Sequence, residues 1–307
     1  MTKFLGDTQS QEASENSVAI QAGRDLHITT SGLSYRDVRE ICIDLLEANF
    51  PKIREESLAI SMQYVEEFGT KFFERLVKED PDSTQEKLKD PDVQAAINTS
   101  IIHVARMTEK SHQDILCELI TEKLNTSEEE ENLILNDAIE VMTKITKNQM
   151  LFLVFITTLR FVSRGKQDHH RNSLHPDNKA QYDFYEKDII EIIGDNIYEI
   201  DTYVLEYKGL IHTKNLYSYN VSLAQIIQES TGRQLLEPNS TKLLNNGLVF
   251  KINFPNLSRL LTKFGFKEIS ELDSLIMTPI ARAIALAYLK NYYNSDISQV
   301  ENELNNK

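Results

Sequence analysis

Apolar residues recur every three to four positions from Leu33 to about Ser163, and this helical period constrains the fold more than any other feature. The chain has only 10 Gly and 7 Pro among its 307 residues, too few for the turns of an all-β protein of this length. Amphipathic helices in series indicate a bundle. We therefore predict a mainly α protein in which residues 33–164 form a helical bundle.

The most apolar stretch of the chain runs from Met150 to Leu159 and ends at Arg160. About ten helical residues span roughly 15 Å, half of a bilayer's hydrocarbon core, so we predict a buried helix and no membrane span. The N-terminal residues turn polar at once and lack the apolar core of a signal peptide. Cys42 and Cys117 are too few for a disulfide framework, so we expect two buried or half-buried thiols in a cytoplasmic protein.

Four consecutive carboxylates, Glu128 to Glu131, follow Ser127. Acidic side chains are favourable at the positive end of a helix dipole. We interpret the run as the solvated first turn of a helix with Ser127 as its N-cap, and not as a metal or acid–base site.

Residues 1–32 differ from the rest of the chain. Residues 7–16 are small and polar, a composition typical of a mobile segment. Residues 17–29 then alternate apolar with polar positions on both sides of Gly23, which indicates two short strands joined by a tight turn. A hairpin of this size is marginal in water, so it must either dock on its own protein or stack on copies of itself.

We predict stacking, and hence a homo-oligomer, while docking on the body stays open. In a stack, apolar ladders between copies would be formed by Val18, Ile20, Leu26 and Ile28. Gly23 would allow the tight turn. The predicted self-association residues are Val18, Ile20, Gly23, Arg24, Asp25, Leu26 and Ile28.

Residues 165–179 are polar and rich in basic and histidine side chains, and we predict that they link two domains. His169, His170 and His175 suggest a metal site. Adjacent histidines cannot easily face one centre on a helix, however, and no second ligand pair with metal spacing accompanies them. We therefore predict no metal and no cofactor.

A smaller, mainly helical module is predicted over residues 180–293, with a polar tail over 294–307. Its Ser and Gly residues mark helix starts and stops, and its short apolar runs indicate strands. The expected elements are a helix with Ile197, Ile200, Val204 and Leu205 that ends at Gly209, a helix from Ser222 to Gly232, a strand with Val249, Phe250 and Ile252, a helix over 255–264, an extended segment with Leu272, Leu275 and Met277, and a helix over 280–292.

Nucleic-acid binding is the alternative function. The helix, extended segment and helix of residues 256–288 could be winged-helix-like, with Arg259, Lys263 and Arg282, or the loop around Arg171, as contacts. The net charge of −14 and the acidic residues directly after Lys267 oppose a basic binding face.

No P-loop, no G-x-G-x-x-G and no G-x-S-x-G occurs in the sequence, so we predict no catalytic residues. An enzyme whose residues meet only in the fold stays open. The predicted function is that of a non-enzymatic interaction or sensor protein that self-associates and can bind a protein partner.

Two parts of the chain resemble known families. Residues 16–25 (NSVAIQAGRD), 32–41 (GLSYRDVREI) and 49–50 resemble the opening of a poorly characterised bacterial family of helical cytosolic proteins, and residues 277–285 (MTPIARAIA) resemble its closing segment. Residues 209–211 and 278–282 are also similar to the C-terminal arrangement of abortive-infection alpha-type proteins, where Gly stands at the place of Ala281. The resemblance implies a role in bacterial defence against phage and assigns no catalytic residue.

Overall fold

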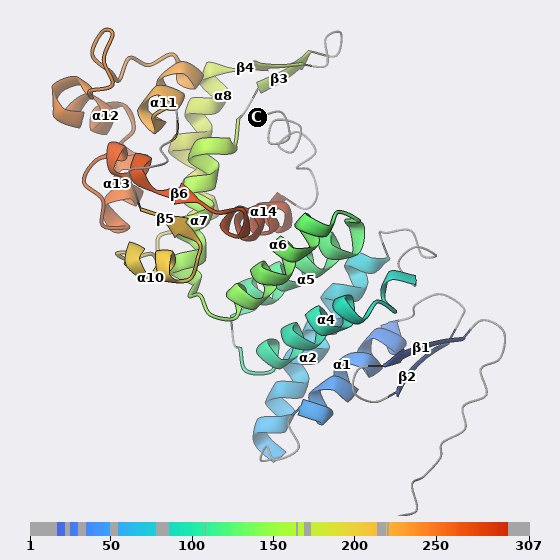
Figure 1. Cartoon of the computed structure of the whole chain (residues 1–307). Helices are drawn as coiled ribbons and strands as arrows, with labels where there is room; N and C mark the ends of the chain where they lie inside the picture. The colour runs from blue at the N-terminus through green and yellow to red at the C-terminus, as the bar shows by residue number, and fades with distance from the viewer. Residues whose placement is uncertain are drawn as a thin grey trace, which may run out of the picture. The chain divides into compact units, whose positions relative to one another are not determined.

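The computed structural model describes residues 17–21, 25–29, 35–49, 55–77, 86–107, 109–163, 165–168, 173–213, 219 and 221–293. These residues are mostly helical (Figure 1), which confirms the mainly α prediction. The chain folds into two compact units, residues 1–108 with 120–126 and residues 109–119 with 127–307. Helix α5 (Lys110–Asn125) contributes residues to both.

The first unit is built on three helices that pack on one another (Figure 1). Its elements are β1 (Ser17–Gln21), β2 (Asp25–Thr29), α1 (Tyr35–Asn49), α2 (Glu55–Leu76) and α4 (Pro91–Val104). Helices α1 and α2 approach closely, since a Cβ added at Gly69 would lie 3.4 Å from the Sγ atom of Cys42. Cys42 and Cys117 are both buried and form no disulfide, as the sequence predicted, and burial raises the pKa of Cys42 to about 12.

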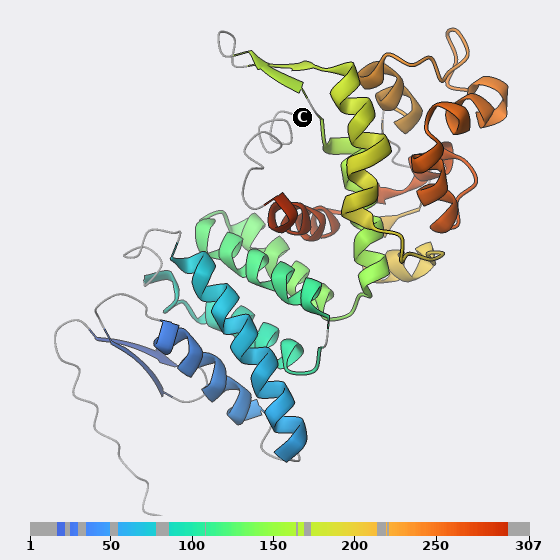
Figure 2. The ribbon, with the colours of Figure 1, turned by 180° about the vertical axis from the view of Figure 1, so that it is seen from behind.

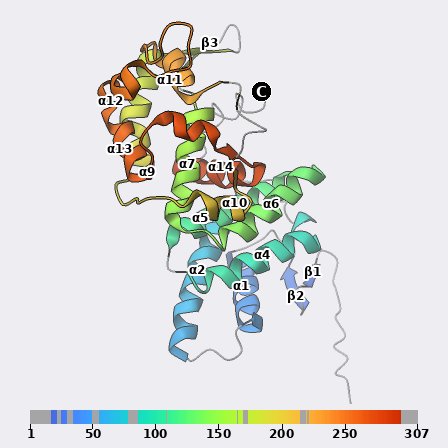
Figure 3. The ribbon, with the colours of Figure 1, turned by 60° about the vertical axis from the view of Figure 1, so that its left-hand side comes forward.

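The second unit holds the remaining elements in a longer series. These are α6 (Glu129–Met142), α7 (Lys147–Phe161), β3 (Gly165–Asp168), β4 (Ser173–Pro176), α8 (Asn178–Asp183), a π-helical turn (Phe184–Asp188), α9 (Ile189–Ile193), α10 (Thr202–Tyr207), β5 (Ile211–His212), α11 (Leu223–Thr231), a 3-10 turn (Leu244–Gly247), α12 (Leu248–Asn253), α13 (Pro255–Lys263), a second 3-10 turn (Ile269–Ser274), β6 (Ile276–Met277) and α14 (Pro279–Tyr293). Helices α11, α12 and α13 lie on the same side of α7 (Figure 3).

Helix α7 is the centre of this unit. All its residues from Met150 to Arg160 are buried, which confirms the predicted buried helix. Phe152 and Phe155 hold the ring of Phe264 at centroid distances of 5.2 and 5.3 Å, and α14 packs across α6 and α7 (Figure 2). Within the described part of the chain, no helix combines the length and apolarity that a membrane span requires.

The predicted linker lies inside the second unit. Residues 165–168 and 173–176 pair as the antiparallel strands β3 and β4, and the compact units divide elsewhere, at residues 108–127. His169 and His170 lie outside the described residues. Among the described residues, no group of three or more His, Cys, Asp and Glu side chains is placed to hold a metal ion.

Four local predictions need correction. The predicted strand around Phe250 is helix α12, which begins directly after three left-handed residues, Asn245, Asn246 and Gly247. The apolar residues there are not half-buried strand positions, since Leu248 and Ile252 are 54% and 69% exposed one helical turn apart.

The predicted helix of residues 197–205 forms only in part, because residues 197–201 are irregular and α10 begins at Thr202, where the Asp201 carboxylate accepts from Tyr203 N. Helix α6 has Glu128 at its N-cap in place of Ser127. Leu272 lies in a 3-10 turn, although Ile276 and Met277 are extended as expected.

The predicted start and end of α11, the end of α13 and the start of α14 are confirmed. Ser222 caps α11 by accepting from Gln225 N, and Gly232 ends it in the left-handed region at φ 68°. Gly265 follows α13 at φ 97°, and α14 begins at Pro279.

Candidate functional site

The predicted self-association segment forms an antiparallel two-stranded ribbon. Val18 stands opposite Ile28, and Ile20 stands opposite Leu26. Because successive residues of a strand occupy opposite faces, these four positions share one face of the ribbon. Asp25 is the first residue of β2, while Gly23 and Arg24 lie outside the described residues.

Both edges of the ribbon are unpaired within the described part of the chain. Strand β2 lies next to helix α1 of its own unit (Figure 1), so docking and stacking both remain open to the segment. Unpaired backbone N–H and C=O groups at a sheet edge are a template for pairing with another chain.

Two of the basic residues predicted for nucleic-acid binding form ion pairs with a carboxylate. Arg259 and Lys263 lie one turn apart on α13, and both pair with Asp195 Oδ1, at 3.4 and 2.9 Å. The hydrogen bond from Lys263 lowers the pKa of Asp195. Arg282 lies on α14, its guanidinium carbon 4.7 Å from the Phe161 ring centroid, and Arg171 lies outside the described residues. The strand between the two helices, β6, pairs with β5.

An ion pair between the buried Arg160 and the half-buried Asp273 joins the end of α7 to the N-terminus of α11. The Arg160 side chain is 2% exposed and donates to Asp273 Oδ1 at 2.8 Å and to Val221 O at 3.1 Å. The same Asp273 oxygen accepts from Leu223 N at 2.7 Å. Burial lowers the pKa of Arg160 and raises that of Asp273, and their mutual attraction opposes both shifts. Each charge therefore has a structural use.

A buried carboxylate, that of Glu186, lies in the π-helical turn. Its two oxygens accept from Asn256 N at 3.1 Å and from Leu257 N at 3.0 Å, in the first turn of α13. Phe254, the N-cap residue of that helix, has no side-chain oxygen to do this. Burial raises the pKa of Glu186, while the two backbone hydrogen bonds lower it. Glu186 thus caps a helix from a distance.

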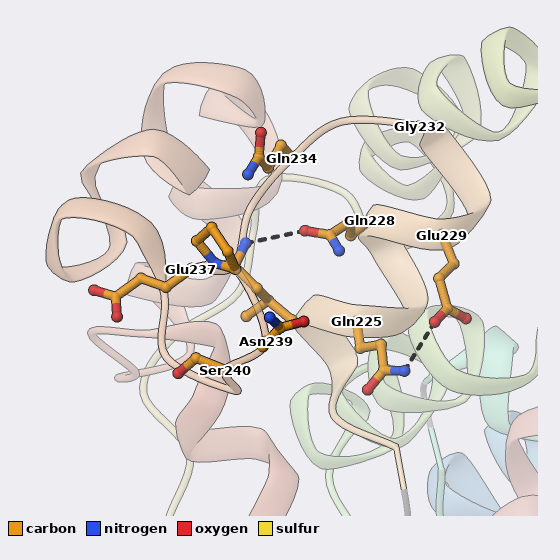
Figure 4. Close-up of a pocket in the computed structure, with 10 residues that line it drawn as sticks. Gln225, Gln228, Glu229, Gly232, Gln234, Glu237, Asn239 and Ser240 are labelled. Atoms are coloured by element: carbon orange, nitrogen blue, oxygen red, sulfur yellow. Dashed lines mark hydrogen bonds between the residues drawn. The ribbon is translucent and has the colours of Figure 1, made fainter.

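A polar pocket of about 600 Å³ opens between α11 and the segment 234–240 (Figure 4). Its helical wall has the spacing of one helix face, opposite the buried residues of α11. That wall consists of Gln225, Gln228, Glu229 and Gly232. This spacing of polar side chains is visible in the sequence, but no known motif marks it as a site.

The other wall is a hairpin-like loop that is fastened to α11. Leu236 and Leu243 form a β-bridge, and Asn239 turns the chain at φ 53°. Gln228 Oε1 accepts from Leu235 N at 2.8 Å and from Leu236 N at 3.0 Å, which ties the loop to the helix. The two walls are therefore held at a fixed separation.

Gly232 sits where the chain leaves α11 for this loop. A Cβ added there would lie 2.7 Å from the Asn178 side-chain nitrogen, in addition to the strain of its positive φ. The positive φ therefore favours glycine at the point where α11 meets the pocket loop.

Residues 32–253 match the model of a protein family. The family is described only as "-like", with no activity, ligand or partner named. No curated protein and no solved structure matches the chain. The matched range contains the pocket and leaves out the ribbon. The description refers neither to an N-terminal segment nor to abortive infection, so both resemblances stay predictions.

Proposed function

We propose that this chain, which belongs to the family whose model spans residues 32–253, is a non-enzymatic interaction protein that self-associates through the β1–β2 ribbon. The observation that carries the proposal is the register of the ribbon, which puts Val18, Ile20, Leu26 and Ile28 on one face beside two unpaired edges. Copies that stack by strand addition would bury these apolar positions and pair the open backbone groups.

The buried charges of the second unit support a binding role over chemistry. Perturbed carboxyls are candidates for catalytic groups. Here Asp273 pairs with Arg160, and Glu186 caps α13, so both are engaged in holding elements together. The resemblance of residues 209–211 and 278–282 to abortive-infection proteins makes phage defence the setting in which we propose that the assembly acts.

Ile20→Asp in the full chain tests the assembly. We expect the wild type to be oligomeric in light scattering and the variant to dissociate, with a dissociation constant raised at least tenfold, since burying one such side chain contributes about 1.5–3 kcal/mol. Ala19→Asp is the matched control, because it adds the same charge on the opposite face. A monomeric wild type at about 100 μM, or equal effects of both variants, contradicts the proposal. Phage plating on cells that express each variant tests the defence setting.

A further inference from the structure

We infer that the pocket between α11 and the segment 234–240 binds a guanidinium group, carried by an arginine side chain of a peptide or by a small guanidine. The pocket lies within the second unit and is independent of the ribbon. It is an open hollow of about 600 Å³, and six of the ten residues that line it are exposed, so a guanidinium group has room to enter.

The charge of the lining selects the sign of the ligand. Glu229 and Glu237 contribute two carboxylates, and no Lys, Arg or His is among the residues that line the pocket. Four carboxamides complete most of the polar surface. These are Gln225, Gln228, Gln234 and Asn239. A phosphate or carboxylate ligand would meet only like charge there, while a cation gains from the field of Glu229.

The acceptors stand on both walls. Gln225 Nε2 donates to Glu229 Oε1 at 2.8 Å, which fixes the Glu229 carboxylate and leaves its Oε2 atom and Gln225 Oε1 as acceptors for a ligand. Asn239 lies across the hollow from Gln225, whereas the Glu237 carboxylate projects away from α11 (Figure 4). Of the two carboxylates, Glu229 stands on the α11 wall, where Gln225 lies between it and Asn239, and Glu237 is a charge at the rim (Figure 4).

A guanidinium fits this arrangement better than an ammonium. Its five N–H donors point in several directions of one plane, so it can bond a carboxylate on one wall and a carboxamide oxygen on the other. It is also weakly hydrated, and its faces can lie on apolar surface, which Leu236 and Pro238 supply. A compact, strongly hydrated ammonium loses more on entering.

Isothermal titration of the full chain with N-acetylarginine N-methylamide tests the inference. We expect a dissociation constant of about 1 mM or tighter at low salt, and at least tenfold weaker binding by N-acetyllysine N-methylamide. Glu229→Gln should weaken arginine binding about tenfold or more. Its amide oxygen can still accept from Gln225, so the wall keeps its shape.

Two matched variants remove the same charge elsewhere. Glu237→Gln at the rim should weaken binding less than threefold or so, and Glu130→Gln on the exposed first turn of α6 should leave it unchanged. Equal losses in all three variants would mean general attraction to the acidic chain and would overturn the inference, as would equal binding of the lysine compound or no binding at all.

The source of the guanidinium is decided by a further pair of probes. A capped pentapeptide with one central arginine among alanines is compared with agmatine. If both depend on Glu229, tighter binding of the peptide indicates a protein partner, and tighter binding of agmatine indicates a small metabolite-like ligand. If neither depends on Glu229, the pocket is not the site.

Discussion

Two carboxyl groups of the second unit, the half-buried Asp273 and the buried Glu186, are held in different ways. Asp273 shares one oxygen between the Arg160 guanidinium and the N-terminus of α11, so a cation in contact offsets its burial. Glu186 accepts from two backbone N–H groups of α13, and Arg233 acts on it through the longer-range field. The comparison teaches that a helix N-terminus can take the place of a counter-ion for a buried carboxylate.

The largest effect is expected where removal of a carboxylate leaves a cation buried. Asp273→Ala would strand Arg160, whose side chain is 2% exposed, and would also leave Leu223 N without its acceptor. We expect a loss of about 3–5 kcal/mol in the free energy of unfolding, measured by urea titration.

Asp195→Ala is the matched control for this variant. Asp195 pairs with two cations, Arg259 and Lys263, but its side chain is 66% exposed. The loss in the free energy of unfolding should therefore be below about 1 kcal/mol. Similar losses for both variants would show that burial of the Arg160 pair is not what matters.

A smaller effect is expected at Glu186, where no cation is stranded. Glu186→Ala leaves the N–H groups of Asn256 and Leu257 without their acceptor, and we expect a loss of about 1–3 kcal/mol. Glu191→Ala, on the exposed side of α9, should stay within about 0.5 kcal/mol of the wild type. A loss at Glu186 as large as that at Asp273 would remove the distinction between the two sites.

The smallest effect concerns pH. Because burial raises the pKa of Glu186, the folded protein holds that proton more tightly than the unfolded chain does. Its contribution to stability is complete below the ordinary glutamate value of about 4.5 and is lost as pH rises through the folded pKa.

Glu186→Gln cannot ionise, so the stability of the wild type relative to this variant should fall as pH rises from about 4 and then level off. Unfolding measured in steps from pH 4 to 8 follows this difference. A difference that rises with pH would contradict the sign of the pKa shift.

The sequence predicted elements whose causes are local. Each of these elements depends on residues that are neighbours in the sequence. They are the apolar stretch of α7, the Ser222 cap, and the Gly232 and Gly265 stops. The helix α12 was missed because Phe250 is the buried member of a short apolar run, and such a run is compatible with strand or helix until its neighbours are known.

The polar contacts between residues far apart in the chain could not be predicted, because their partners are brought together only by the fold. Arg160 is 113 residues from Asp273, and Glu186 is 71 from Leu257, so no spacing in the chain announces either pair. Only one wall of the pocket could be predicted from the sequence. Its α11 wall follows the helical period from Gln225 to Gly232, while the opposing loop is placed only by the fold.

The π-helical turn couples the length of the chain at residues 184–188 to the capping of α13. Each residue of an α-helix adds about 100° of rotation, so deletion of one residue from 184–188 would swing Glu186 away from Asn256 and Leu257. A homologous chain that is one residue shorter here could keep α13 only by gaining its own capping side chain at the place of Phe254, such as Ser or Asp. Deletions within 184–188 and substitutions of Phe254 by a capping residue should therefore occur together during the divergence of this family.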